Sequence, residues 1–190
     1  MDTPQLDQRF RSLRRFNIVM ACLHAAQGVA MFVLSSDFSL PVTSAFVQYN
    51  ALTQRLEPVL KTLVELRIGP LVAAFLFLSA LAHLAISLPG IYEWYVANLK
   101  KGINVARWIE YAFSSSLMIV IIAMLVGLYD VATLILIFSL NACMILFGWV
   151  MEKHNQTTKR TDWTSFVFGS FAGIIPWVAI AIYLVGAGSG

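Results

Sequence analysis

Five long apolar segments constrain this chain more than any other feature of its sequence. They cover residues 16–35, 68–88, 105–127, 131–150 and 166–186. Each is close to the roughly 20 apolar residues that a helix needs to cross a bilayer. An open strand in lipid would leave backbone groups without hydrogen bonds, so the segments are expected to be helices. The sequence therefore predicts an all-α membrane protein, with one transmembrane domain over residues 1–190.

The composition excludes several other classes of protein. Hydrophobic residues make up 59% of the chain and charged residues only 12%, against about 25% charged residues in soluble domains. A soluble enzyme, a disordered chain and a coiled coil are therefore excluded. The net charge of +3 does not indicate a nucleic-acid partner, because the basic residues are scattered and form no face interleaved with aromatic residues.

The loops predict how the protein lies in the cell membrane. Nine Lys and Arg residues fall in the N-terminal segment and in the second and fourth loops, against three in the first and third loops. The positive-inside rule then places the N-terminus in the cytoplasm of a multi-pass protein. The long first loop alternates in places and is expected to hold at most a short β hairpin, which Pro58 limits.

Four ionisable residues lie inside the expected spans: His24, His83, Arg107 and Glu110. Such residues are costly in lipid and are candidates for function by default. At 1.5 Å per residue, His24, His83 and Glu110 fall at similar depth in the cytoplasmic half of the membrane. They could share a polar cavity there. Alternatives stay open: the histidines could only pack, and Arg107 could snorkel or pair with Glu110. Glu110 could instead neutralise a cation from elsewhere.

Further polar and aromatic residues continue from this group into the third, fourth and fifth helices. They are Ser114, Met118, Asn141, Met144, Ile145, Pro176 and Trp177. A pocket that changes from polar to aromatic suits a long apolar ligand with one charged end. A metal site and an intramembrane hydrolase are weaker alternatives, because no ligand pair and no Ser–His pair lies on one helix. No catalytic residue, no metal and no enzyme activity are therefore expected.

Several of these residues resemble a known family. The stretch from Arg107 to Ser116, RWIEYAFSSS, resembles the third-helix motif of heliorhodopsins, and Asn141-Ala-Cys-Met144 resembles their fourth helix. His24 and His83 stand where that family has two cytoplasmic-side histidines. The long first loop and the cytoplasmic N-terminus also match, and the resemblance covers essentially the whole chain.

The resemblance implies a seven-helix, rhodopsin-like bundle that binds all-trans retinal through a protonated Schiff base to a lysine on the seventh helix. It implies Glu110 as the counterion, and His24, His83 and Arg107 as the proton network. Ser114, Met118, Asn141, Met144 and Ile145 would line the polyene, with Pro176 and Trp177 near the ring. It also implies a homodimer with a small β hairpin in the first loop, and leaves the signalling partner open.

The sequence departs from this family in one respect. All five lysines fall in loops, so these 190 residues are expected to be the first part of a longer protein, before helices six and seven. After Glu110 the third helix has no carboxylate before Asp130. That favours a photoreceptor with a slow photocycle over an outward proton pump. A proton or ion channel or transporter, and a non-photoactive membrane scaffold, are the alternatives.

Overall fold

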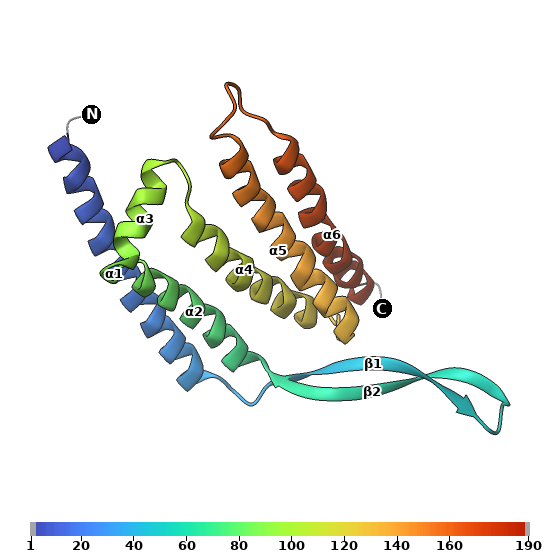
Figure 1. Cartoon of the computed structure of the whole chain (residues 1–190). Coiled ribbons are helices and arrows are strands. Elements are labelled where there is room, and N and C mark those ends of the chain that lie inside the picture. The colour runs from blue at the N-terminus through green and yellow to red at the C-terminus, as the bar shows by residue number, and fades with distance from the viewer. Residues whose placement is uncertain (1–2, 189–190) are drawn as a thin grey trace.

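The computed structural model describes residues 3–188, with side chains from residue 8 onward. Figure 1 shows six helices and one two-stranded hairpin in this part of the chain. In chain order they are α1 (Thr3–Leu34), β1 (Ser39–Asn50), β2 (Arg55–Arg67), α2 (Ile68–Ala85), α3 (Ile91–Lys100), α4 (Val105–Leu125), α5 (Val131–His154) and α6 (Thr164–Ala187).

Five of the described helices are long and apolar enough to cross a membrane: α1, α2, α4, α5 and α6. The predicted class, an all-helical membrane bundle with a hairpin in the first loop, is therefore confirmed. The bounds of the helices differ from those of the apolar segments. Helix α1 begins 13 residues before the apolar segment, because no Gly or Pro interrupts residues 5–27 and only those residues break a helix strongly.

The first loop holds a long hairpin, so the expectation of a short one limited by Pro58 is wrong. Its strands pair antiparallel from Ser39 opposite Arg67 to Asn50 opposite Arg55, with one irregularity after Val42. Pro58 lies opposite Val47. A two-stranded ribbon consists only of edge strands, which tolerate proline because half of their N–H groups point away from the partner.

The turn of the hairpin is held by a polar cluster. Asn50 and Thr53 donate hydrogen bonds to the Glu57 carboxylate at 2.9 and 2.7 Å. These bonds, that of Thr53 foremost, lower the pKa of Glu57 below its usual value. The tip is therefore a defined polar turn at the end of a ribbon.

Helix α3 was not predicted, because residues 89–104 were expected to be a loop with interfacial side chains. The helix begins after Gly90, whose φ of 82° suits glycine. The Gly90 N–H donates to the Glu93 carboxylate, which is the glutamate half of a capping box. Tyr95 is buried and Trp94 is exposed, so the helix is amphipathic and lies between two membrane spans.

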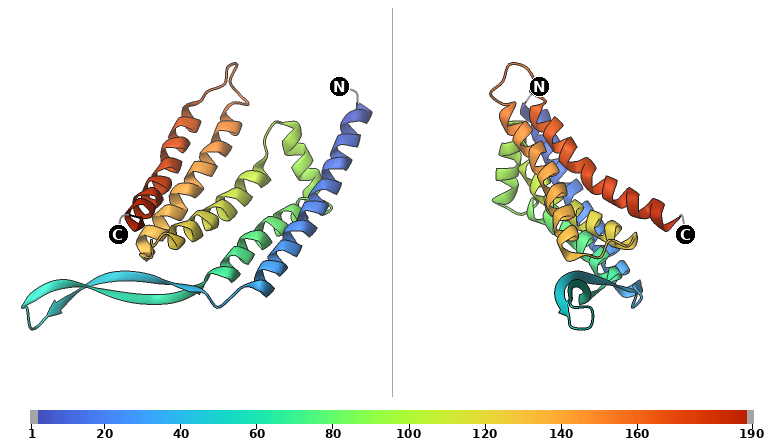
Figure 2. Two further views of the ribbon diagram at one scale, coloured as in Figure 1. Left: turned by 180° about the vertical axis from the view of Figure 1, so that it is seen from behind. Right: turned by 90° about the vertical axis from the view of Figure 1, so that its right-hand side faces the viewer.

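The five spans run alternately up and down, and each packs on the next in the order α1, α2, α4, α5, α6. The N-terminus, α3 and the α5–α6 loop lie at one end of the bundle. The hairpin, the α4–α5 turn and the end of α6 lie at the other, and the hairpin projects well beyond the helices (Figure 2). The loops thus divide between the two ends as the positive charge count assumed.

The hydrophobic core sits at the hairpin end of the bundle. Ile119 and Met124 of α4 are its largest fully buried apolar side chains, and residues of β1, α2, α5 and α6 pack around them. The Thr43 N–H donates to the Tyr129 carbonyl at 2.8 Å, which ties the hairpin to the α4–α5 turn. The other end of the bundle is left for polar groups.

Candidate functional site

Glu110 lies on the second turn of α4 and is half-buried between helices. The Ser79 hydroxyl of α2 donates a hydrogen bond of 2.7 Å to its carboxylate. A hydrogen bond of this kind stabilises the charged form of a carboxylate. Among the residues whose side chains are described, no cation forms an ion pair with Glu110.

His24 of α1 and His83 of α2 lie side by side. Their rings are stacked, with centroids 5.7 Å apart and planes 18° apart. His83 Nδ1 lies 3.1 Å from Asn17 Oδ1, and His24 Nδ1 lies 3.2 Å from Gln27 Oε1. Each imidazole therefore has a polar neighbour at its Nδ1 nitrogen.

A polar cavity of about 160 Å³ connects His83 with Glu110. Its other polar lining residues are Asn17, Tyr95, Asn104, Arg107 and Tyr111. The Asn17 side chain is buried, and its Nδ2 has no hydrogen-bond partner among the described residues. Burial raises the pKa of the Tyr95 phenol, so Tyr95 stays a neutral hydroxyl. A cavity of this size and polarity can hold ordered water.

Arg107 does not pair with Glu110, although the sequence left that alternative open. Its Nη2 lies 2.6 Å from Glu152 Oε1 at the end of α5. Trp108 Nε1 and the Asn104 N–H also donate to Glu152, at 2.7 and 2.9 Å. Glu152, which takes the place of Glu110 as the partner of Arg107, belongs to α5. Residue spacing along α4 therefore could not predict this pair. Glu110 therefore has no ion pair with a described side chain.

The polar residues beyond Glu110 on α4, and the one that faces them on α5, are buried. Ser114 and Ser116 of α4 and Asn141 of α5 are all buried. Asn141 Nδ2 donates to the hydroxyls of Ser115 and Ser116 at 2.8 and 3.0 Å, so the expected partner of this amide is found on α4. Ser115 also donates back to its own helix at the Tyr111 carbonyl.

The apolar candidates are placed less uniformly. Met144 lies against Gly173 so closely that a Cβ on this glycine would overlap the methionine sulfur, and α5 and α6 approach each other there. Pro176 is buried, and Ile145 is half-buried. Met118 and Trp177 lie on exposed faces of their helices. The described residues thus group Ser114, Asn141 and Met144 inside the bundle, but not Met118 and Trp177.

The sequence did not predict three residues of this site as functional candidates: Asn17, Ser79 and Glu152. A signal existed for two of them. Ser79 stands one helical turn before His83, and Asn17 stands two turns before His24, so each shares a face with a histidine. Glu152 gave no such signal. A metal-binding group of three His, Cys, Asp or Glu residues does not occur in the part of the chain that the structure describes.

A comparison with protein families decides the class. A family model described as heliorhodopsin matches residues 13–190. This chain belongs to the heliorhodopsin family. No curated protein matches the sequence at a significant level. Heliorhodopsins are retinal-binding membrane proteins of the photoreceptor type, which implies retinal as the chromophore.

The site fits one part of such a chromophore and lacks another. A buried organic cation requires a nearby anion, and a half-buried carboxylate inside a span, held by Ser79, has the matching charge. Ser114 of α4 and Asn141 and Met144 of α5 then lie between these two helices. Of the five lysines of this heliorhodopsin sequence, four lie outside the candidate spans, and Lys153 lies in the last turn of α5, at the loop end of its span.

Proposed function

We propose that this heliorhodopsin is a light-sensing photoreceptor with a slow photocycle, and that Glu110 is the counterion of its chromophore. The observation that carries the proposal is the Glu110 carboxylate inside the membrane, hydrogen-bonded to Ser79 and free of any ion pair with the described side chains. Retinal, when bound, supplies a polyene that isomerises in light and a cation at its linked end. Glu110 neutralises that cation.

The proposed roles of the other residues follow from their positions. His83 and Asn17 share the cavity with Glu110, and His24 stacks on His83. We propose that His24 and His83 hold or accept a proton that leaves the counterion region in light. Arg107 lines the same cavity but is held by Glu152, so its charge shapes the proton path without neutralising Glu110.

We propose that Ser114, Met118, Asn141, Met144 and Ile145 line the polyene, and that Pro176 and Trp177 lie toward its ring end. The support is the buried polar cluster of Ser114, Ser116 and Asn141 next to an apolar region at Met144 and Gly173. The side chains of Met118 and Trp177 are exposed, so they can contact a ligand. The assignment of these two is the most dependent on the family.

An outward proton pump is disfavoured by what Asp130 does. It is the next carboxylate along the chain after Glu110, and it lies beyond the end of α4. Its Oδ2 accepts from both the N–H and the hydroxyl of Thr133, each at 2.9 Å, so it caps α5. This carboxylate is therefore engaged in capping α5 and does not line the cavity that holds Glu110.

We also propose the cytoplasmic N-terminus and a homodimer. The nine basic residues at the N-terminal end support the first. The hairpin supports the second, because it projects from the bundle with exposed apolar side chains such as Phe46, Val47 and Leu60. Large exposed apolar surface of this kind marks interaction sites. The signalling partner stays open.

The test uses the protein expressed from its complete gene with all-trans retinal. The proposal expects a visible absorption band, a light-induced change that recovers slowly, and no net proton transport in vesicles under illumination. The polar cavity around His83 favours a second candidate, a light-gated proton channel. A light-evoked current or pH change in vesicles would establish that candidate instead.

A further inference from the structure

A second cavity lies outside the chromophore region, between the first turns of α1 and the amphipathic helix α3. It has a volume of about 410 Å³. Phe10 and Arg11 line it from α1, and Tyr92, Val96, Ala97 and Lys100 line it from α3. The groove therefore combines two cations with an apolar floor, next to the N-terminal end of the bundle.

The two cations of this groove have no ion pair with a described carboxylate. Neither Arg11 nor Lys100 forms an ion pair with a side chain of residues 8–188. Lys100 Nζ lies 5.4 Å from the centroid of the Phe10 ring, and Arg14 lies 5.0 Å from that of Tyr92. Glu93 is the one acidic residue in the lining, and it accepts the Gly90 N–H in the capping box. The groove is thus left with net positive charge.

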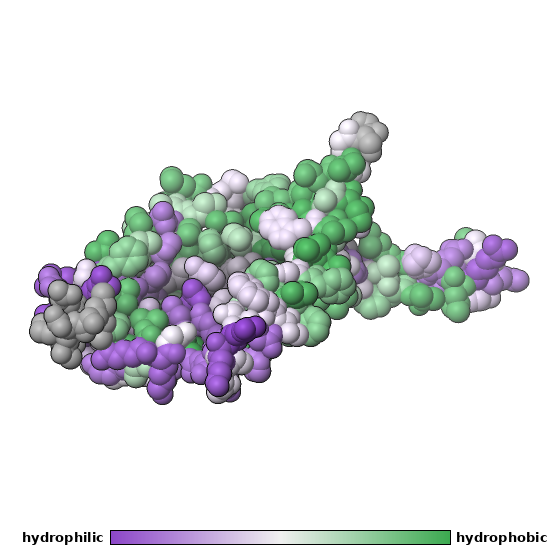
Figure 3. Space-filling view, turned by 90° about the horizontal axis from the view of Figure 1, so that it is seen from above, coloured by the Kyte–Doolittle hydropathy of each residue, from purple (hydrophilic) through white to green (hydrophobic). Residues whose placement is uncertain are grey.

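The position of the groove matches the surface of a membrane. The apolar part of α1 starts at residue 16, less than two turns after Phe10, and Trp94 is exposed on α3, as in the aromatic belts at membrane interfaces. Seen from the end that carries the N-terminus, the molecule has a broad hydrophilic area bordered by apolar flanks (Figure 3). An amphipathic helix at this level is suited to contact with the interface.

We propose that the groove between α1 and α3 binds the headgroup of an anionic phospholipid of the surrounding leaflet. Arg11 and Lys100 contact the phosphate, and Phe10, Val96 and Ala97 contact the start of the acyl chains. The two unpaired cations favour a lipid with net negative charge over a zwitterionic one. The apolar floor and the exposed Trp94 favour a lipid over a soluble phosphate.

The test compares phosphatidylglycerol with phosphatidylcholine bound to the purified protein in detergent, measured by native mass spectrometry. Phosphatidylglycerol is expected to be retained, and the double variant Arg11→Gln, Lys100→Gln to lose at least about tenfold of this retention. Lys159→Gln, Arg160→Gln is the matched control, because it removes the same charge from the exposed α5–α6 loop. An equal loss in the control, or equal retention of the two lipids, would overturn the proposal.

A second measurement needs no change in the groove. Brominated lipids quench nearby tryptophans, and the contribution of Trp94 is the difference between the wild type and Trp94→Phe. In vesicles with equal mole fractions, brominated phosphatidylglycerol is expected to quench Trp94 more strongly than brominated phosphatidylcholine. Equal quenching contradicts the proposal. Release of the bound lipid by inorganic phosphate would show a soluble anion site instead.

Discussion

At the scale of single residues, the Ser79–Glu110 hydrogen bond is the contact closest to the proposed chemistry. Ser79→Ala removes the only described donor to this carboxylate. Hydrogen bonds to charged groups contribute about 1.5–3 kcal/mol, so the loss of this donor is expected to change how Glu110 interacts with the chromophore's cation and to displace the visible band of Ser79→Ala from that of the wild type. Absorption spectra over a pH series measure this.

Ser115→Ala is the control for that experiment, because Ser115 contacts Asn141 and its own helix but not Glu110. Its visible band should stay at the wild-type position. If Ser79→Ala and Ser115→Ala displace the band equally, the hydrogen bond of Ser79 to Glu110 does not act on the chromophore.

Glu152 is the second residue whose role can be isolated. Glu152→Gln removes the charge that holds Arg107, Trp108 and the start of α4. Because the pair is partly exposed, we expect a loss of about 1–2 kcal/mol, seen as a lower midpoint of thermal unfolding in detergent. Arg67→Gln is the comparison: its partner Asp37 is almost fully exposed, so the midpoint should hardly change. Equal changes of the unfolding midpoint in the two variants would contradict the proposed role of Glu152 in holding the start of α4.

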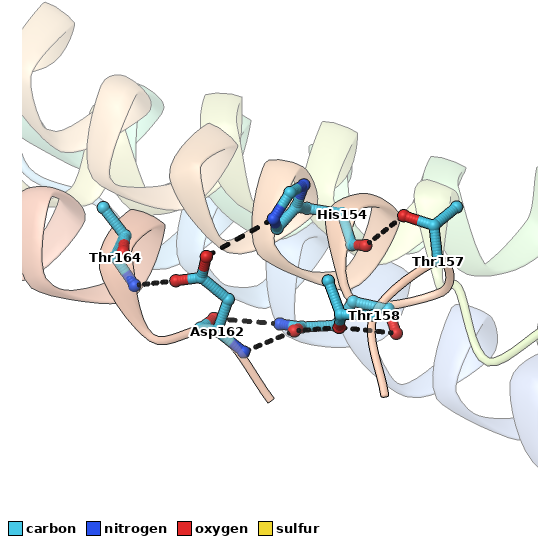
Figure 4. Close-up of polar contacts among 6 residues, drawn as sticks. His154, Thr157, Thr158, Asp162 and Thr164 are labelled. Atoms are coloured by element: carbon cyan, nitrogen blue, oxygen red, sulfur yellow. Dashed lines mark hydrogen bonds and ion pairs between the residues drawn. The ribbon is translucent and has the colours of Figure 1, made fainter. Parts of the chain in front are cut away.

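At the scale of elements, the loop between α5 and α6 carries a pH-sensitive polar network. Asp162 accepts the Thr164 N–H at 2.8 Å and lies 3.4 Å from His154 Nε2 (Figure 4). The bonds to Thr164, and then His154, lower the pKa of Asp162 in spite of some burial. A lowered pKa stabilises the fold above the unfolded value of about 3.9, and this contribution is lost as the pH falls through the folded value.

Acidification is therefore expected to loosen residues 155–164 before the spans respond. Hydrogen exchange followed by mass spectrometry should show falling protection of this segment below about pH 4. In Asp162→Asn the protection should already be low at neutral pH and change little on acidification. A loop in the wild type that keeps its protection at low pH would contradict this account.

At the scale of the whole molecule, the bundle was predictable and its cross-helix contacts were not. Apolar length alone located the five spans, because lipid enforces helices. The partner of Arg107 could not be predicted, because Glu152 approaches it only through the packing of α5 on α4. Helix α3 was missed because its ten residues are too short for the span criterion, although Pro89-Gly90 before it and Glu93 in its first turn are signals of a helix start. The hairpin is longer than expected because an edge strand accommodates Pro58.

The orientation of the bundle leads to a prediction about access from each side. After replacement of Cys22 and Cys143, an impermeant maleimide added to intact cells should label Thr53→Cys at the hairpin tip. It should not label Lys159→Cys in the α5–α6 loop, because that loop lies at the N-terminal end of the bundle. Labelling of Lys159→Cys alone would reverse the proposed topology.

The central claim is that Glu110 neutralises the chromophore's cation. The most direct measurement is the absorption spectrum of Glu110→Gln beside that of the wild type, both expressed from the complete gene with all-trans retinal. Removing an anion next to a cation changes the energy of the charged chromophore. The account predicts a displaced band in Glu110→Gln and the loss of the wild-type acid transition. A spectrum identical to the wild type across the pH series would contradict it.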